Sequence, residues 1–102
     1  MVYELRIYRL HPGTKPAFLE GFKKARRFMK KYGMTFVAAW ENPDREDEFI
    51  WIRSFANLKA RDKSTEAFYG SPEWAKIVDD LRPCIRRREV RVMKSLPYST
   101  LK

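Results

Sequence analysis

The sequence has little of what disulfides, metal sites and membrane spans require. Its 102 residues include one cysteine, Cys84, and one histidine, His11, so no disulfide can form within the chain. This pair cannot supply the usual ligand set of zinc, and we expect no metal site. No apolar run approaches the roughly 20 residues that cross a bilayer, and the N-terminus lacks the apolar core of a signal peptide. We therefore expect a cytoplasmic protein without membrane insertion.

Motifs of nucleophilic and phosphate chemistry are missing as well. The chain contains no Gly-rich phosphate loop, serine-centred elbow or zinc-protease motif. Cys84 has no histidine companion that would make it a nucleophile. His11 lies in a His-Pro-Gly turn, where a structural or solvated role is favoured over catalysis. The sequence points to no catalytic residue and no cofactor, and leaves open whether the protein is an enzyme.

Aromatic and basic residues are abundant instead. Aromatic residues make up 15% of the chain and hydrophobic residues 44%, enough for a single core. Lys and Arg number 22 against 13 acids, a net charge of +9 that favours either anionic partners or simply a soluble, self-repelling surface. The length fits one domain, which we place at residues 1–96, followed by a loose tail at 97–102.

Hydrophobic spacing predicts an α+β fold. Alternation predicts strands at Val2–Leu10, Met34–Glu41, Glu48–Phe55 and Ile85–Leu96. Helical spacing predicts a helix from a Thr14 cap to about Tyr32 and another from Asn57 to Pro83, broken at Gly70 and restarted by Ser71-Pro72-Glu73. The order β-α-β-β-α-β is that of the ferredoxin-like fold with a four-stranded antiparallel sheet.

The alternation also divides the sheet into two faces. We expect the helices to cover the aliphatic sets Leu5 and Ile7, Ile50 and Ile52, and Val90 and Val92. Monomers seldom expose large apolar patches, so the other face predicts an interface, here a homodimer, or a ligand site. That face would carry Glu4, Arg6, Tyr8, Phe36, Trp40, Phe49, Trp51, Arg53, Glu89 and Arg91.

A ligand site is predicted on adjacent strands of this aromatic face. Paired arginines can hold a carboxylate while rings enclose the rest of a small anionic or aromatic molecule. Alternatively, Glu4 and Glu89 neutralise the arginines, because an unpaired buried charge is costly. The predicted ligand-binding residues are Arg6, Tyr8, Trp51 and Arg53.

Nucleic-acid binding is a rival interpretation. The RRM shares this topology and stacks bases on aromatic residues of its strands. Its signature requires glycines that the segment 48–55, EFIWIRSF, does not contain. We therefore expect no specific nucleic-acid partner.

Three segments resemble the NIPSNAP family: YELRIY at 3–8 followed by Pro12-Gly13, FIWIRSF at 49–55, and FYGSPEW at 68–74, where Ser71 replaces a glycine of many relatives. The resemblance implies a dimeric α+β barrel, in which two ferredoxin-like units pair their open sheet faces. Cofactor-free monooxygenases, haem-degrading enzymes, isomerases and lyases share that architecture, so a cofactor-free monooxygenase or isomerase is an alternative function. The family has no settled chemistry, and the resemblance implies no catalytic residue.

Overall fold

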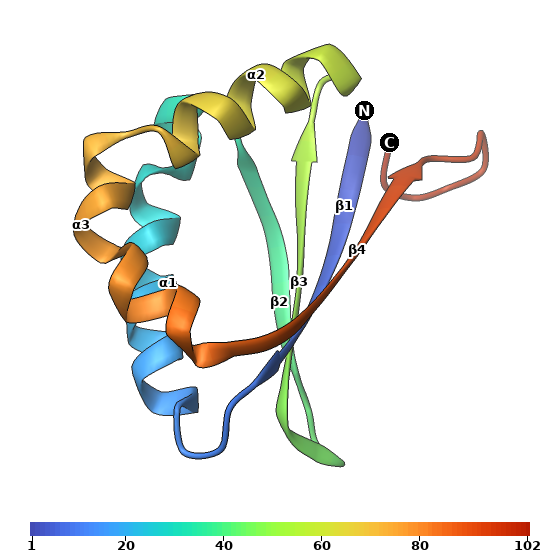
Figure 1. The fold of residues 1–102 in the computed structure, drawn as a ribbon. Coiled ribbons are helices and arrows are strands. Elements are labelled where there is room, and N and C mark those ends of the chain that lie inside the picture. The colour runs from blue at the N-terminus through green and yellow to red at the C-terminus, as the bar shows by residue number, and fades with distance from the viewer.

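The computed structural model describes residues 1–102 and has the predicted β-α-β-β-α-β order. The ferredoxin-like α+β fold is thereby confirmed, with the second helical segment divided in two (Figure 1). The elements are β1 (Val2–Leu10), α1 (Lys15–Met29), η1 (Lys30–Tyr32), β2 (Thr35–Asn42), β3 (Arg45–Phe55), α2 (Leu58–Tyr69), α3 (Pro72–Leu81), η2 (Arg82–Cys84) and β4 (Ile85–Lys94).

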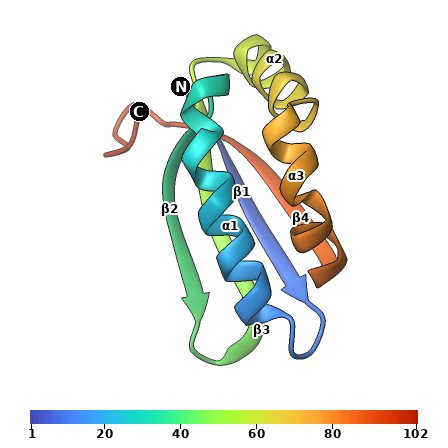
Figure 2. The same cartoon turned by 90° about the vertical axis from the view of Figure 1, so that its left-hand side faces the viewer.

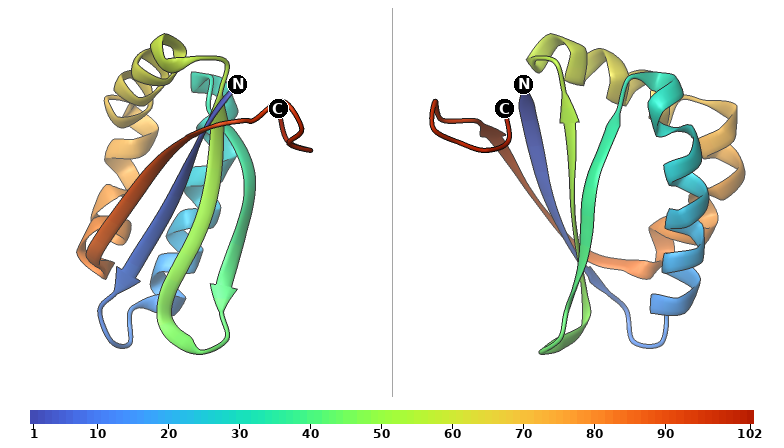
Figure 3. Two further views of the ribbon diagram at one scale, coloured as in Figure 1. Left: turned by 90° about the vertical axis from the view of Figure 1, so that its right-hand side faces the viewer. Right: turned by 180° about the vertical axis from the view of Figure 1, so that it is seen from behind.

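The four strands form one antiparallel sheet in the order β2-β3-β1-β4, which places β1 between β3 and β4. All helices lie on one side of it, with α1 and α3 next to each other (Figures 2 and 3). Gly21 permits this approach, since a Cβ there would lie 2.8 Å from Leu81 Cδ2 of α3. No helix covers the other side of the sheet, and only the C-terminal tail reaches it, where Leu96 and Tyr98 line a hollow with Tyr3 and Ile52.

Local hydrogen bonds explain where two of the helices begin. The backbone N–H of Trp74 donates to Ser71 Oγ at 3.1 Å, which starts α3 directly after α2. The Asn57 side chain accepts from the backbone of Ala60 at 2.8 Å in the same way. Thr14 directly precedes α1, as predicted, but its side chain accepts no hydrogen bond from the first turn of the helix. Its hydroxyl donates instead to the carbonyl of His11 at 2.7 Å.

The two faces of β1 and β3 are the reverse of the prediction. Tyr8, Phe49 and Trp51 are buried beneath the helices, where the rings of Phe22 and Trp51 lie 4.9 Å apart. Their large rings fill the space between sheet and helices better than short aliphatic side chains would. The predicted core residues of these strands lie instead on the open face, half-buried: Leu5, Ile7, Ile50 and Ile52.

The outer strands follow the prediction more closely. Val90 pairs with Arg6 and Val92 with Glu4, so both valines are on the helical side as expected. Glu89 and Arg91 lie on the open face, also as expected. In β2 the register shifts between Phe36 and Ala38. The shift sends Trp40 to the open face, as predicted, and Phe36 to the helical side, against the prediction.

Candidate functional site

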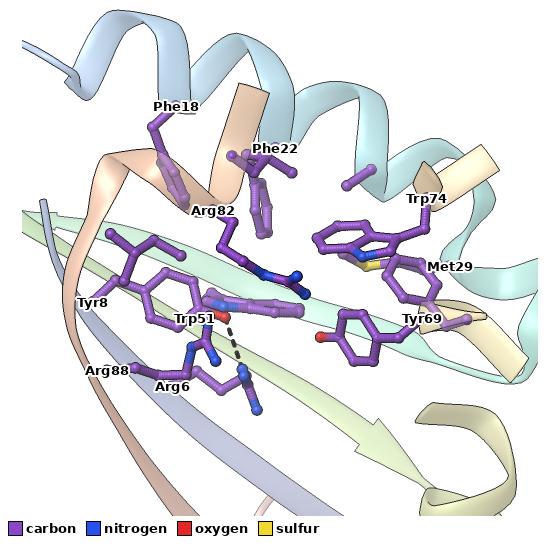
Figure 4. Close-up of a pocket in the computed structure, with 14 residues that line it drawn as sticks. Arg6, Tyr8, Phe18, Phe22, Met29, Trp51, Tyr69, Trp74, Arg82 and Arg88 are labelled. Carbon is purple, nitrogen blue, oxygen red and sulfur yellow. Dashed lines mark hydrogen bonds between the residues drawn. The ribbon is translucent and has the colours of Figure 1, made fainter. Parts of the chain in front are cut away.

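A cavity of about 180 Å³ lies between the sheet and the helices (Figure 4). The sheet supplies Arg6, Tyr8 and Trp51, and helix α1 supplies the rings of Phe18 and Phe22. The remaining lining residues come from the rest of α1, α2, α3, η2 and β4, and they are Ala25, Met29, Phe68, Tyr69, Trp74, Leu81, Arg82, Ile85 and Arg88. Apolar walls with a few arginines are typical of a small-molecule site.

A buried carboxylate organises the arginines beside the cavity. Glu4, which is 1% exposed, accepts hydrogen bonds from Arg6 Nη1 and Arg53 Nε on its Oε1, each at 2.8 Å. Its other oxygen, Oε2, accepts from Nε of Arg61 in α2. Three guanidinium groups thus surround one carboxylate, and the cluster carries excess positive charge.

The environment of this cluster favours the ionised forms of Glu4 and Arg6. Burial alone would raise the pKa of Glu4, but hydrogen bonds from Arg61, Arg53 and Arg6, with the charge of Arg53, lower it from 4.5 to about 2. Burial would likewise lower the pKa of Arg6, but Tyr8, Tyr69 and Glu4 raise it above its usual value. Glu4 and Arg6 are therefore both ionised at neutral pH.

Two tyrosine hydroxyls connect the cluster to the cavity. Arg6 Nε donates to Tyr8 Oη at 2.8 Å, and Arg53 Nη1 donates to Tyr69 Oη at 2.8 Å. In Figure 4 both hydroxyls extend toward the middle of the cavity, near Trp51. The Arg6 guanidinium lies 5.6 Å from the Tyr8 ring centroid and 6.0 Å from that of Trp51, within range of cation–π attraction.

The structure brings three of the predicted site residues together. Arg6, Tyr8 and Trp51 line the same cavity, but on the helical side of the sheet rather than on its open face. Arg53 does not line it, because its guanidinium is occupied by Glu4, Tyr69 and the Met34 sulfur. A ligand-binding role for these four residues stays a prediction.

The alternative prediction, that Glu4 and Glu89 neutralise the arginines of the site, is correct for Glu4 and wrong for Glu89. Glu4 does pair with the arginines, as described above. Glu89 contacts Arg87 at 3.3 Å and Arg91 at 3.6 Å on the open face, away from Arg6 and Arg53.

Several cavity residues were not predicted. Tyr69 and Trp74 belong to the segment FYGSPEW at 68–74, which was not among the predicted ligand-binding residues. Arg82 and Arg88 are exposed and lie in basic stretches with no distinguishing pattern. The contact of Arg61 with Glu4 joins residues far apart in the chain, and no local pattern indicates it.

Other candidate residues lie outside this cavity. His11 is exposed, and Cys84 is buried with its thiol 3.3 Å from the carbonyl of Asp80. No group of three or more His, Cys, Asp or Glu is arranged to hold a metal ion. None of the helices has both the length and the apolar character needed to cross a membrane.

An RRM-like surface is contradicted by the direction of the aromatic side chains. Tyr8, Phe49 and Trp51 would have to project from the open face to stack bases. They are buried beneath the helices instead. The open face presents Leu5, Ile7, Ile50 and Ile52, which offer no stacking platform.

A ferredoxin-like α+β domain with an arginine- and aromatic-lined cavity is the class of protein that the fold and site define. The model of the NIPSNAP family matches residues 3–100, and the chain belongs to the NIPSNAP family, as its three motifs predicted. Protein NipSnap of Drosophila melanogaster is 29% identical over 98 residues, which cover 96% of this chain and 36% of that protein.

Solved structures agree with this membership. A NIPSNAP family protein of unknown function from Agrobacterium tumefaciens has 26% identity and a TM-score of 0.90, covering 100% of this chain and 94% of its own. A putative antibiotic biosynthesis monooxygenase from Bordetella bronchiseptica has 15% identity and a TM-score of 0.75, covering 93% and 96%. The second likeness concerns the fold alone.

Proposed function

We propose that this protein binds a small anionic molecule with an aromatic or apolar body in the cavity between its sheet and helices. The observation that carries the proposal is the cavity itself. Well-packed interiors contain few voids larger than a water molecule, whereas this one measures about 180 Å³. An apolar cavity of about 150 Å³ accommodates benzene, so the space suits one substituted aromatic ring.

The charges around the cavity support an anionic ligand. Arg6 lies at its base, and the exposed guanidinium groups of Arg82 and Arg88 line it as well. No carboxylate is among the lining residues, and the nearby Glu4 is already shared by three arginines. The resulting positive potential in a low-dielectric setting attracts a negative group.

Binding can be measured by tryptophan fluorescence, because Trp51 and Trp74 line the cavity. We expect saturable quenching or enhancement with a panel of small aromatic acids, and a raised Tm at saturating ligand. Ala25→Leu inserts a larger apolar side chain into the cavity and should abolish binding. The matched control Ala75→Leu lies at an exposed position of α3 and should bind normally. Equal binding by both variants, or none by the unaltered protein, would refute the proposal.

A cofactor-free monooxygenase or isomerase would need a base in the same cavity. The lining contains neither histidine nor carboxylate, and its tyrosine hydroxyls already accept from arginines. The cavity therefore favours binding, and the enzymatic alternative rests on fold likeness.

For the open face of the sheet we propose pairing with a second copy of the chain. Trp40 is 48% exposed there, beside the half-buried aliphatic side chains of β1 and β3. A standard stable interface buries about 1,600 Å² in total. Light scattering should report a dimer, and Ile50→Glu should convert it to a folded monomer. A stable monomer of the unaltered protein at micromolar concentration would contradict this.

The reversed faces change which substitution tests the dimer. Trp51, which the sequence places on the open face, is 2% exposed within the core. A charge at Trp51 would therefore unfold the subunit rather than separate two subunits.

A further inference from the structure

The side chains that line the cavity offer hydrogen-bond donors and almost no acceptors. Arg6, Arg82 and Arg88 carry guanidinium groups, and Trp51 and Trp74 carry indole N–H groups; all five are donors only. The lining contains no carboxylate, amide, serine, threonine or histidine side chain. Only the two tyrosines and the weakly accepting sulfur of Met29 remain.

The tyrosine hydroxyls also act as donors toward the cavity. A guanidinium has no acceptor, so in the bonds Arg6 Nε to Tyr8 Oη and Arg53 Nη1 to Tyr69 Oη the tyrosine oxygen must accept. In both bonds the hydroxyl is the acceptor, which leaves its own O–H free to donate to another group. Both hydroxyls extend toward the space beside Trp51 in Figure 4.

Trp51 supplies a third unused proton. Its side chain is 2% exposed and lines the cavity, and its Nε1 has no hydrogen-bond partner. Buried indole N–H groups are nearly always bonded. An orphaned donor on a buried residue of the lining, together with the buried hydroxyl of Tyr8, indicates a group that the isolated chain does not provide.

We infer that the ligand presents an oxyanion, a carboxylate or an ionised phenol or enol, to the protons of Tyr8, Tyr69 and Trp51, with Arg6 supplying the compensating charge. This inference rests on the proposed function and names the ligand class. A ligand that brings N–H or O–H groups instead would bury donors against donors. Each unpaired group then weakens binding by roughly tenfold or more, which gives the site its selectivity.

Three probes of nearly equal size separate this inference from the proposed function: benzoate, benzamide and toluene. We expect benzoate to bind at least about tenfold more tightly than benzamide, which replaces one oxygen by an NH₂ donor. Equal or tighter binding of benzamide or toluene would overturn the oxyanion assignment while leaving the cavity a binding site. Failure of all three to bind would refute the proposed function itself.

Tyr8→Phe locates the oxyanion, because it removes one proton and keeps the ring. We expect the affinity for benzoate to fall about tenfold and the affinity for toluene to change little. The ratio of the two affinities, measured on one variant, does not depend on how much of that variant is folded. Tyr69→Phe serves as the second variant if Tyr8→Phe does not fold. Tyr98→Phe, in the exposed tail, is the matched control. An unchanged benzoate-to-toluene ratio in the cavity variant tested would place the oxyanion elsewhere and overturn the inference.

Discussion

Replacing Glu4 by glutamine removes one negative charge and almost no volume from the centre of the arginine cluster. Arg6 and Arg53 are 7% and 2% exposed, so neither guanidinium can turn to water without moving the strands. Glutamine can accept from one or two of them but cannot offset their charge. Removal of one partner from a buried ion pair typically costs about 3–5 kcal/mol, because the remaining charge stays buried.

The pKa of Glu4 gives an independent magnitude. Its fall from 4.5 to about 2 corresponds to about 3 kcal/mol of stabilisation of the ionised form in the folded state. A domain of 102 residues has a total stability of roughly 5–15 kcal/mol. Glu4→Gln should therefore remove about a fifth or more of the free energy of unfolding.

Urea denaturation followed by tryptophan fluorescence measures this loss. With m of about 1–3 kcal/mol/M, the midpoint should fall by roughly 1–3 M at constant m. Glu66→Gln, at an exposed position of α2, is the control and should change stability by less than about 0.5 kcal/mol. A Glu4→Gln protein within about 1 kcal/mol of the unaltered protein would show that the cluster tolerates three unneutralised arginines, and the reasoning would be wrong.

Four further outcomes follow from the same structure. Because the folded pKa of Glu4 is depressed, its contribution is complete above pH 4.5 and lost as pH falls toward 2; acid titration of the unfolding free energy should show this decline, and Glu4→Gln should lack it. Arg6→Met leaves the carboxylate two guanidinium partners and should cost only about 1–2 kcal/mol in urea denaturation. Ser71→Ala removes the cap of α3 and should cost about 1 kcal/mol in the same assay. Ile50→Glu, designed as a monomer, should bind aromatic acids as the unaltered protein does, measured by tryptophan fluorescence.

The topology could be predicted from the sequence because its determinants are local. Alternation identified each strand, and Ser71 with Pro72 identified the restart of the second helix. The ferredoxin-like topology implied by this order of elements has β1 between β3 and β4, as the structure does. Arg6, Tyr8 and Trp51 were grouped correctly for the same reason, since residues paired across adjacent strands share a face whichever way that face points.

Which face the helices cover could not be predicted by the same means. Alternation divides the side chains of a strand into two sets but does not say which set faces the helices. Aliphatic residues are among those most often buried, which is why the prediction placed them in the core. Here the deciding contacts are distant in sequence: Arg61 of α2 reaches Glu4 of β1, and Phe22 of α1 packs on Trp51 of β3. Burial of Glu4 is acceptable only once those arginines surround it.

The reversal separates the proposed ligand site from the proposed dimer surface. Had the aromatic face been open, a second subunit would have been needed to close the cavity, and binding would have depended on the dimer. With Tyr8 and Trp51 beneath the helices, the cavity lies on the helical side of the sheet, away from the open face. The open face keeps an aliphatic surface with Trp40 exposed and is free to pair independently. Coupling between the two would have to pass through the sheet itself, where Arg6 on one face alternates with Leu5 and Ile7 on the other.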